Sequence, residues 1–96
     1  MNIQINAVNF AIAQRLTDFT KDKIEKLYKM YDEIVGIDIN YKTENISGEE
    51  NKTAEVLVKV PGNDLFAGKT SKTFEQALDE AVDALKKQIE KRKKAK

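Results

Sequence analysis

The sequence contains no cysteine and no histidine. Without cysteine it can form neither disulfides nor thiolate metal sites, which fits a reducing compartment. Without histidine it lacks the commonest general base and the commonest protein ligand for metals. Its four glycines stand singly, so there is no glycine-rich phosphate loop. We therefore expect no metal site, no cofactor and no enzymatic activity on a small-molecule substrate.

Long hydrophobic runs are also missing. No stretch approaches the roughly 18–20 apolar residues of a membrane span. The alternating start of the chain, from Met1 to Asn6, is unlike a secretory signal. These features predict a cytoplasmic protein without membrane contact. The 96 residues suffice for a single domain, 1–96, with one modest core.

Apolar residues recur with two different periods along the chain. Period two is typical of half-buried strands, and a period near 3.6 indicates helices. The predicted order is strand 2–8, helix 13–31, strands 35–42, 54–60 and 65–71, and a last helix 73–94. This β-α-β-β-β-α order defines an α+β fold, a four-stranded mixed sheet with both helices packed on one face, as in double-stranded-RNA-binding domains. The first two strands should be parallel and the hairpin-linked strands antiparallel. Phe19 and Leu85 fall on the two apolar helix faces, so we expect both in the core.

Local signals mark the ends of several elements. Pro61 to Asp64 is predicted to form a tight turn, because proline presets φ and glycine tolerates positive φ. The polar, acidic segment 44–51 is predicted to be a mobile hairpin loop. Thr73 and Gln76 match a capping box, in which each side chain satisfies a backbone N–H at the start of the last helix.

Positive charge is concentrated at one end of the chain. The basic helix end, residues 86–96, holds seven cations and one anion, so it carries +6, whereas the whole chain carries +1. Such a directional field favours polyanions, and RNA phosphates are the expected partner. The alternative is that the helix macrodipole alone places cations at this C-terminus.

Helical geometry predicts where these cations lie. At about 100° per residue, three lysines of the last helix form one row that faces away from its apolar stripe: Lys87, Lys91 and Lys94. Lys86 and Lys93 form a second row on the flank. Lys23 and Lys26 share one half of the first helix, so neighbouring helices would enclose a groove with two basic rows. The last helix is about 33 Å long and an eight-residue strand only about 26 Å, so its final turns should project beyond the sheet and expose charge on every side.

Two segments resemble the hibernation promoting factor and ribosome-associated inhibitor A family. Residues 23–34, KIEKLYKMYDEI, resemble the family's first-helix exit, in which a basic residue and Lys-Leu precede an aromatic turn near Asp. Ala77-Leu78-Asp79 followed by LKKQIEK at 85–91 is similar to the family's Ala-Ile-Asp and Lys-Leu-x-Arg-Gln-Leu-x-Lys. Length and element order fit as well, so the resemblance covers essentially the whole chain.

The resemblance implies a bacterial, cytoplasmic, non-enzymatic protein of the stress response or stationary phase. It would bind the small ribosomal subunit, on 16S rRNA, in the channel for mRNA and the A- and P-site tRNAs, and so block translation. RNA shape rather than sequence would be recognised. Matching positions assign RNA contacts to Lys23, Lys26, Lys87 and Lys91, and helix geometry adds Lys86, Arg92 and Lys94.

The chain departs from the family pattern in three places. Ala84 stands where a lysine is usual, and Thr73-Phe74-Glu75-Gln76 where Asp-Met-Tyr is frequent. The chain ends at Lys96, so we interpret it as a short form without the second domain of long members. Ribosome pairing would then need a separate partner such as ribosome modulation factor.

Three other functions are compatible with parts of the pattern. A generic structured-RNA-binding domain would bind isolated RNA duplexes as well as ribosomes. A protein-interaction regulator of the sigma-54 modulation type would bind a protein with little salt dependence. An enzyme could use the carboxylates of Asp79 and Asp83, which lie one helical turn apart, but a solvated helix surface explains them better.

Overall fold

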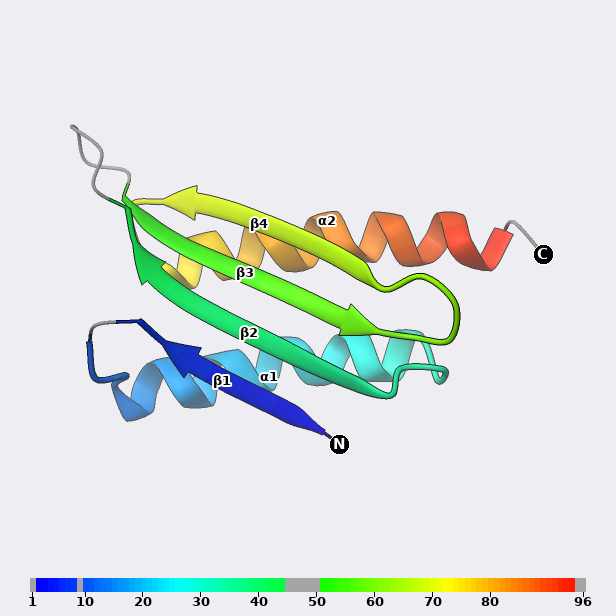
Figure 1. Ribbon diagram of the computed structural model, residues 1–96, viewed down its shortest axis with the longest axis horizontal. Coiled ribbons are helices and arrows are strands. Elements are labelled where there is room, and N and C mark those ends of the chain that lie inside the picture. Colours follow the sequence, from blue (N-terminus) through cyan, green and yellow to red (C-terminus); the bar gives the residue numbers. More distant parts are fainter. Residues whose placement is uncertain (1, 9, 45–50, 95–96) are drawn as a thin grey trace.

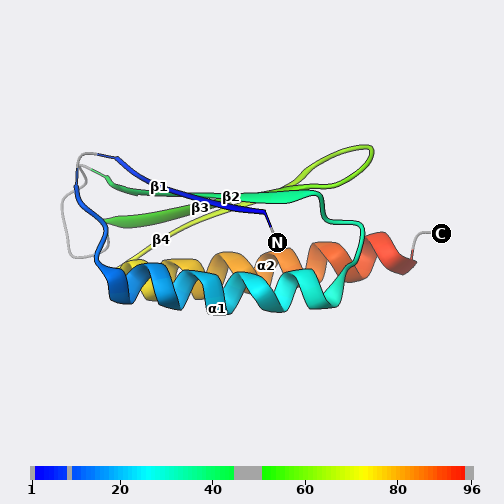
Figure 2. The same ribbon diagram turned by 90° about the horizontal axis from the view of Figure 1, so that it is seen from below.

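The computed structural model describes residues 2–8, 10–44 and 51–94. Figure 1 shows six elements in chain order: β1 (Ile3–Ala7), α1 (Gln14–Met30), β2 (Gly36–Thr43), β3 (Lys52–Lys59), β4 (Leu65–Ser71) and α2 (Phe74–Lys94). The strands lie in the order β1-β2-β3-β4, with β1 parallel to β2 and the other pairs antiparallel. Both helices cover one face of the sheet and run in the same direction (Figure 2). The predicted fold and strand directions are confirmed.

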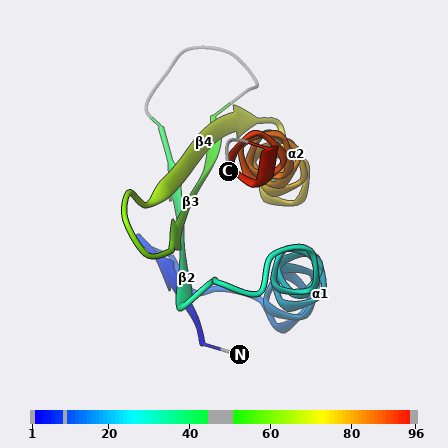
Figure 3. The ribbon, with the colours of Figure 1, turned by 90° about the vertical axis from the view of Figure 1, so that its right-hand side faces the viewer.

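The core lies between the sheet and the two helices (Figure 3). On β2, Ile37, Ile39 and Tyr41 stand opposite Val58, Val56 and Ala54 of β3, and all six are at most 1% exposed. Period two places these side chains on one face, where apolar burial contributes about 25 cal/mol per Å². The helices add Ile24, Leu27, Leu78, Leu85 and Ile89, which are fully buried. Leu85 is therefore a core residue, as predicted.

The core face of α1 differs from the prediction at one position. Phe19 is only half-buried, whereas Thr20 is fully buried. The Thr20 hydroxyl lies 2.6 Å from the Leu16 carbonyl oxygen and 2.6 Å from the Tyr41 hydroxyl. A hydroxyl that is hydrogen-bonded in this way can occupy a core position without the cost of an unpaired polar group. Phe19 packs against the core but is only partly buried, so the expectation that it lies in the core is confirmed only in part.

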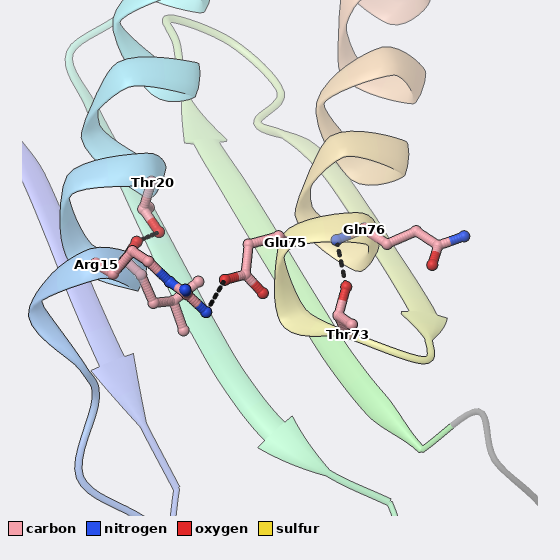
Figure 4. A network of polar contacts seen from close by, with 6 residues as sticks. Arg15, Thr20, Thr73, Glu75 and Gln76 are labelled. Atoms are coloured by element: carbon pink, nitrogen blue, oxygen red, sulfur yellow. Dashed lines mark hydrogen bonds and ion pairs between the residues drawn. The ribbon is translucent and has the colours of Figure 1, made fainter.

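The start of α2 forms half of the predicted capping box. The Thr73 hydroxyl accepts a hydrogen bond from the Gln76 backbone N–H at 3.0 Å, whereas the Gln76 side chain points away from Thr73 (Figure 4). The predicted reciprocal bond is therefore wrong, since the Gln76 side chain is exposed and turned away from Thr73. Phe74, the first residue of α2, stacks on Phe10 and meets the Tyr41 ring edge-on, at centroid distances of 4.9 and 5.3 Å.

The turn between β3 and β4 is confirmed. Gly62 has φ +89, a conformation that residues with a side chain rarely adopt. The Asp64 carboxylate accepts a hydrogen bond from the Val60 N–H at 3.3 Å. Most of the acidic segment 44–51 lies outside the described residues, so the expectation of a mobile loop there stays a prediction.

Neither helix in the described part of the chain has the length and apolarity needed to cross a membrane.

Candidate nucleic-acid interface

The cations divide into those that already have a partner in the fold and those that do not. Five are ion-paired: Arg15, Lys23, Lys29, Lys42 and Lys59. Three more donate hydrogen bonds to oxygen atoms: Lys52, Arg92 and Lys93. Within residues 2–8, 10–44 and 51–94, the lysines with no such partner are Lys21, Lys26, Lys69, Lys86, Lys87, Lys91 and Lys94. These seven, which we call the unpaired lysines, are the positive charges available to an external anion.

The unpaired lysines are distributed asymmetrically. Lys42 and Lys59 project from the open face of the sheet, and both are neutralised: Lys59 by Asp38 at 3.1 Å, and Lys42 by Glu55 at 3.4 Å. Six of the unpaired lysines belong to the helices. The seventh, Lys69, pairs in register with the buried Ala54, so its side chain leaves β4 on the helix side. The lysines without partners therefore lie on the helical side of the molecule, where Asp22, Glu80, Asp83 and Glu90 offset part of their charge.

The groove between α1 and α2 is not the doubly basic groove that was predicted. Lys23 Nζ lies 2.7 Å from Asp79 Oδ1, and its side chain is only 25% exposed. The ammonium also lies 5.6 Å from the centre of the Phe19 ring. Nearer the start of the helices, Arg15 faces Glu75 at 4.0 Å (Figure 4). Ion pairs thus join the two helices here, and the Lys23 ammonium already has a carboxylate partner in Asp79.

The last turns of α2 are packed against the rest of the fold. Arg92 Nη1 donates to the Asn63 carbonyl at 2.7 Å, and Nη2 donates to the Pro61 carbonyl. Lys93 Nζ donates to the Met30 carbonyl at the end of α1, at 3.3 Å. The expectation that these turns expose their charge on every side is therefore wrong. Arg92 fixes the end of α2 to the β3–β4 turn, which leaves fewer of its N–H groups for RNA.

The structure places Lys87 and Lys91 on the opposite flank of α2 from α1. They line a cleft between α2 and β4, whose other lining residues are Lys69, Glu80, Asp83, Ala84 and Gln88. Gln88 Nε2 donates to the Phe66 carbonyl at 2.9 Å, which fixes this flank of α2 against the edge strand. Lys86 faces the other way and is half-buried, whereas Lys26 and Lys94 are exposed.

Sequence reasoning missed Lys69. Strand alternation does place it in the inward row of β4 with Leu65 and Ala67, so a lysine in an otherwise apolar row was the available signal. Its side chain reaches the cleft because β4 is the edge strand beside α2.

The titratable groups give no support to acid–base chemistry. Burial raises the pKa of Tyr41 to about 12, although its hydrogen bond with Thr20 lowers it and Glu75 adds a smaller increase. Burial also raises the pKa of Tyr28, whose hydroxyl donates to the Asn2 carbonyl. In the described part of the chain, no group of three or more acidic side chains is placed to hold a metal ion. Asp79 is paired with Lys23, so it does not form a carboxylate pair with Asp83.

The fold and its unpaired cations define a small α+β protein with a surface suited to polyanions. The chain belongs to the family described as sigma 54 modulation protein / S30EA ribosomal protein, whose family model matches residues 3–96. The resemblance seen in the sequence is thereby confirmed.

Curated relatives of similar length share this sequence pattern. The ribosome hibernation promoting factor of Pseudomonas putida is 23% identical over 93 residues, which cover 97% of this chain and 87% of that protein. The protein of the same name from Acinetobacter guillouiae is 24% identical over 100 residues, with coverages of 98% and 88%.

Solved structures have the same architecture. A ribosomal subunit interface protein from Coxiella burnetii aligns with a TM-score of 0.84 at 28% identity over the full length of both chains. The N-terminal domain of Protein Y from Thermus thermophilus aligns with a TM-score of 0.78 at 24% identity, covering 95% of this chain and 98% of that one. The second likeness shows the shared fold.

Proposed function

We propose that this protein is a ribosome hibernation factor that acts without catalysis. It binds the small ribosomal subunit in the channel for mRNA and the A- and P-site tRNAs, and its presence there excludes those ligands. The names of the relatives and of the Coxiella burnetii structure support a ribosomal role. One observation supports contact with 16S rRNA: the unpaired lysines lie on the helical side, while the charges on the open sheet face are compensated.

The mechanism that we propose is steric exclusion driven by contacts with phosphates. Each lysine that neutralises a phosphate releases a condensed counterion, which favours binding at low salt. The α2 lysines Lys86, Lys87, Lys91 and Lys94 supply most of this charge, with Lys26 from α1. Lys23 joins them only if RNA displaces Asp79. Contacts of this kind recognise the shape of folded RNA rather than its sequence.

Co-sedimentation with purified 30S subunits and 70S ribosomes across a salt series tests this function. We expect near-stoichiometric binding to 30S that weakens steeply with salt and that excess free duplex RNA does not compete away. Equal affinity for any duplex would replace the proposal with a generic structured-RNA-binding module. Absence of binding even at low salt would favour a protein-interaction regulator of the sigma-54 modulation type.

Two finer features belong to the same proposal. The chain functions in the cytoplasm, where ribosomes are, during stress or stationary phase. If ribosome pairs form, we propose that they need a separate small protein such as ribosome modulation factor. Sucrose-gradient profiles with and without that factor test this: pairs formed by the chain alone would contradict it.

A further inference from the structure

The cleft between β4 and α2 collects unpaired lysines from two separate elements. Lys69 comes from the edge strand, and Lys87 and Lys91 come from α2. All three are exposed, and none has an ion-pair partner in the described part of the chain. Like charges that share a cleft repel one another, so without an external anion this arrangement costs free energy. Glu80 and Asp83 also line this cleft and offset part of that charge, so its three lysines and two carboxylates leave an excess of one positive charge.

The lysines follow the length of the cleft. Lys87 and Lys91 are one helical turn apart, about 6 Å along the axis at 1.5 Å per residue. The hydrogen bond from Gln88 to the Phe66 carbonyl places Gln88 of α2 beside Phe66 of β4. The strand β4 runs opposite to α2 (Figure 1). Lys69 lies three residues beyond Phe66, about 10 Å further along the strand. The three ammonium groups thus mark a line that a single strand of phosphates can follow.

Two of the residues that line the cleft beside these lysines carry no charge. Ala84 contributes only a methyl group, and Gln88 is held against the sheet edge by its hydrogen bond. A longer side chain at position 84 would fill the space between Lys69 and Lys87. Glu80 and Asp83 also line the wall, and by the same rises they lie at about the level of Lys69. Their charge repels phosphates, so it weakens the hold on a bound strand at the Lys69 end of the cleft.

We propose that the β4–α2 cleft, rather than the groove between the helices, holds the backbone of one 16S rRNA segment. Lys69, Lys87 and Lys91 neutralise its phosphates, and Lys69 is a binding residue on the sheet. This inference rests on the proposed ribosomal function, and it adds the place and direction of one RNA strand.

The test compares single charge-removing variants in equilibrium binding to purified 30S subunits at several salt concentrations. Lys69→Gln, Lys87→Gln and Lys91→Gln should each weaken binding about three- to tenfold and lower the slope of log affinity against log salt by about 0.7–0.9. Lys69→Arg should keep the wild-type slope, because the charge remains. Lys59→Gln is the control, a lysine on the open sheet face that is paired with Asp38, and should bind as the wild type does. Thermal unfolding of each variant verifies that the fold is intact.

One double variant, which removes the charge of both carboxylates, tests the direction of the strand. Glu80→Gln combined with Asp83→Asn should strengthen binding about three- to tenfold, because the repulsion at that end of the cleft is removed. The proposal for the cleft would be contradicted if Lys69→Gln bound as the wild type does while Lys87→Gln and Lys91→Gln bound more weakly. That result would leave the proposed function intact. Failure of the wild type to bind 30S subunits would overturn both.

Discussion

A buried pair of hydroxyls connects α1 to the centre of the sheet, and its contribution to stability can be measured. Thr20 and Tyr41 are both fully buried, with their oxygen atoms 2.6 Å apart. The Thr20 oxygen is also 2.6 Å from the Leu16 carbonyl. A hydroxyl has one proton. Since Thr20 donates it to Leu16, Tyr41 must be the donor in the bond between the two hydroxyls.

This assignment predicts unequal effects for the two single variants. Thr20→Val leaves the buried Tyr41 hydroxyl without an acceptor and should reduce the free energy of unfolding by about 1–3 kcal/mol. Tyr41→Phe removes one hydrogen bond but leaves the Thr20 proton bonded to Leu16, so it should cost about 0.5–1.5 kcal/mol. In the double variant both hydroxyls are gone and the shapes are nearly kept. The double variant should therefore lose less free energy of unfolding than the two single variants lose in sum, and no more than Thr20→Val loses alone.

Urea denaturation of the four proteins closes a double-mutant cycle. Thr17→Val is the matched control, because Thr17 lies on the same helix and is only half-buried. It should change stability by less than about 0.5 kcal/mol. Additive effects of Thr20→Val and Tyr41→Phe would refute the hydrogen-bond reasoning, since they would mean that the two hydroxyls are not coupled.

Other parts of the structure lead to four further expectations. Burial raises the pKa of Tyr41 from 10.0 to about 12. The contribution of neutral Tyr41 to the free energy of unfolding is therefore complete below pH 10 and is lost as the pH rises towards 12. Stability should fall by roughly 2–3 kcal/mol over that window, and Tyr41→Phe should remove most of this fall in pH-dependent melting. Arg92→Gln should lower stability by about 0.5–1.5 kcal/mol and speed hydrogen exchange in the β3–β4 turn, whereas unchanged exchange would show that Arg92 does not anchor α2. Asp79→Asn should change stability by less than about 1 kcal/mol yet tighten 30S binding by releasing Lys23, and weaker binding would mean that Asp79 positions Lys23 for RNA. Leu85→Ala should cost about 2–5 kcal/mol through cavity formation, and a wild-type melting curve would contradict its place in the core.

Much of the fold could be predicted because the apolar pattern and the hydrogen-bonding geometry agree. Ile37, Ile39 and Tyr41 alternate over one strand, and α2 has an apolar stripe from Phe74 to Ile89. Thr20 could not be predicted in the same way. Its burial depends on Tyr41, which is 21 residues away along the chain.

The positions of the binding lysines were harder to predict than the elements that carry them. Helical periodicity shows that Lys87 and Lys91 face away from the apolar stripe, but it does not say on which flank α1 lies. In the structure, Asp79 and Lys93 mark the flank beside α1, and Gln88 marks the flank beside β4. The tertiary arrangement therefore separates lysines that the helical projection had placed in one groove.

Arg92 shows a related limit of sequence reasoning. A cation near the end of a basic helix is expected to interact with RNA or with the helix dipole. Here its guanidinium instead meets the carbonyls of Pro61 and Asn63, some 30 residues earlier in the chain. Gly62 favours this approach, since a Cβ at that position would lie 3.1 Å from Arg92 Nη2, a tight contact that the guanidinium would have to relieve by a small shift.

The central claim is that the helical side of this protein occupies the small-subunit channel for mRNA and tRNA. Cryo-electron microscopy of the purified protein bound to 30S subunits at low salt tests it most directly. We predict density for the chain across the A- and P-site channel, with α2 and the unpaired lysines against 16S rRNA phosphates and the open sheet face turned away. Density elsewhere on the subunit, or the sheet face against RNA, would contradict this account.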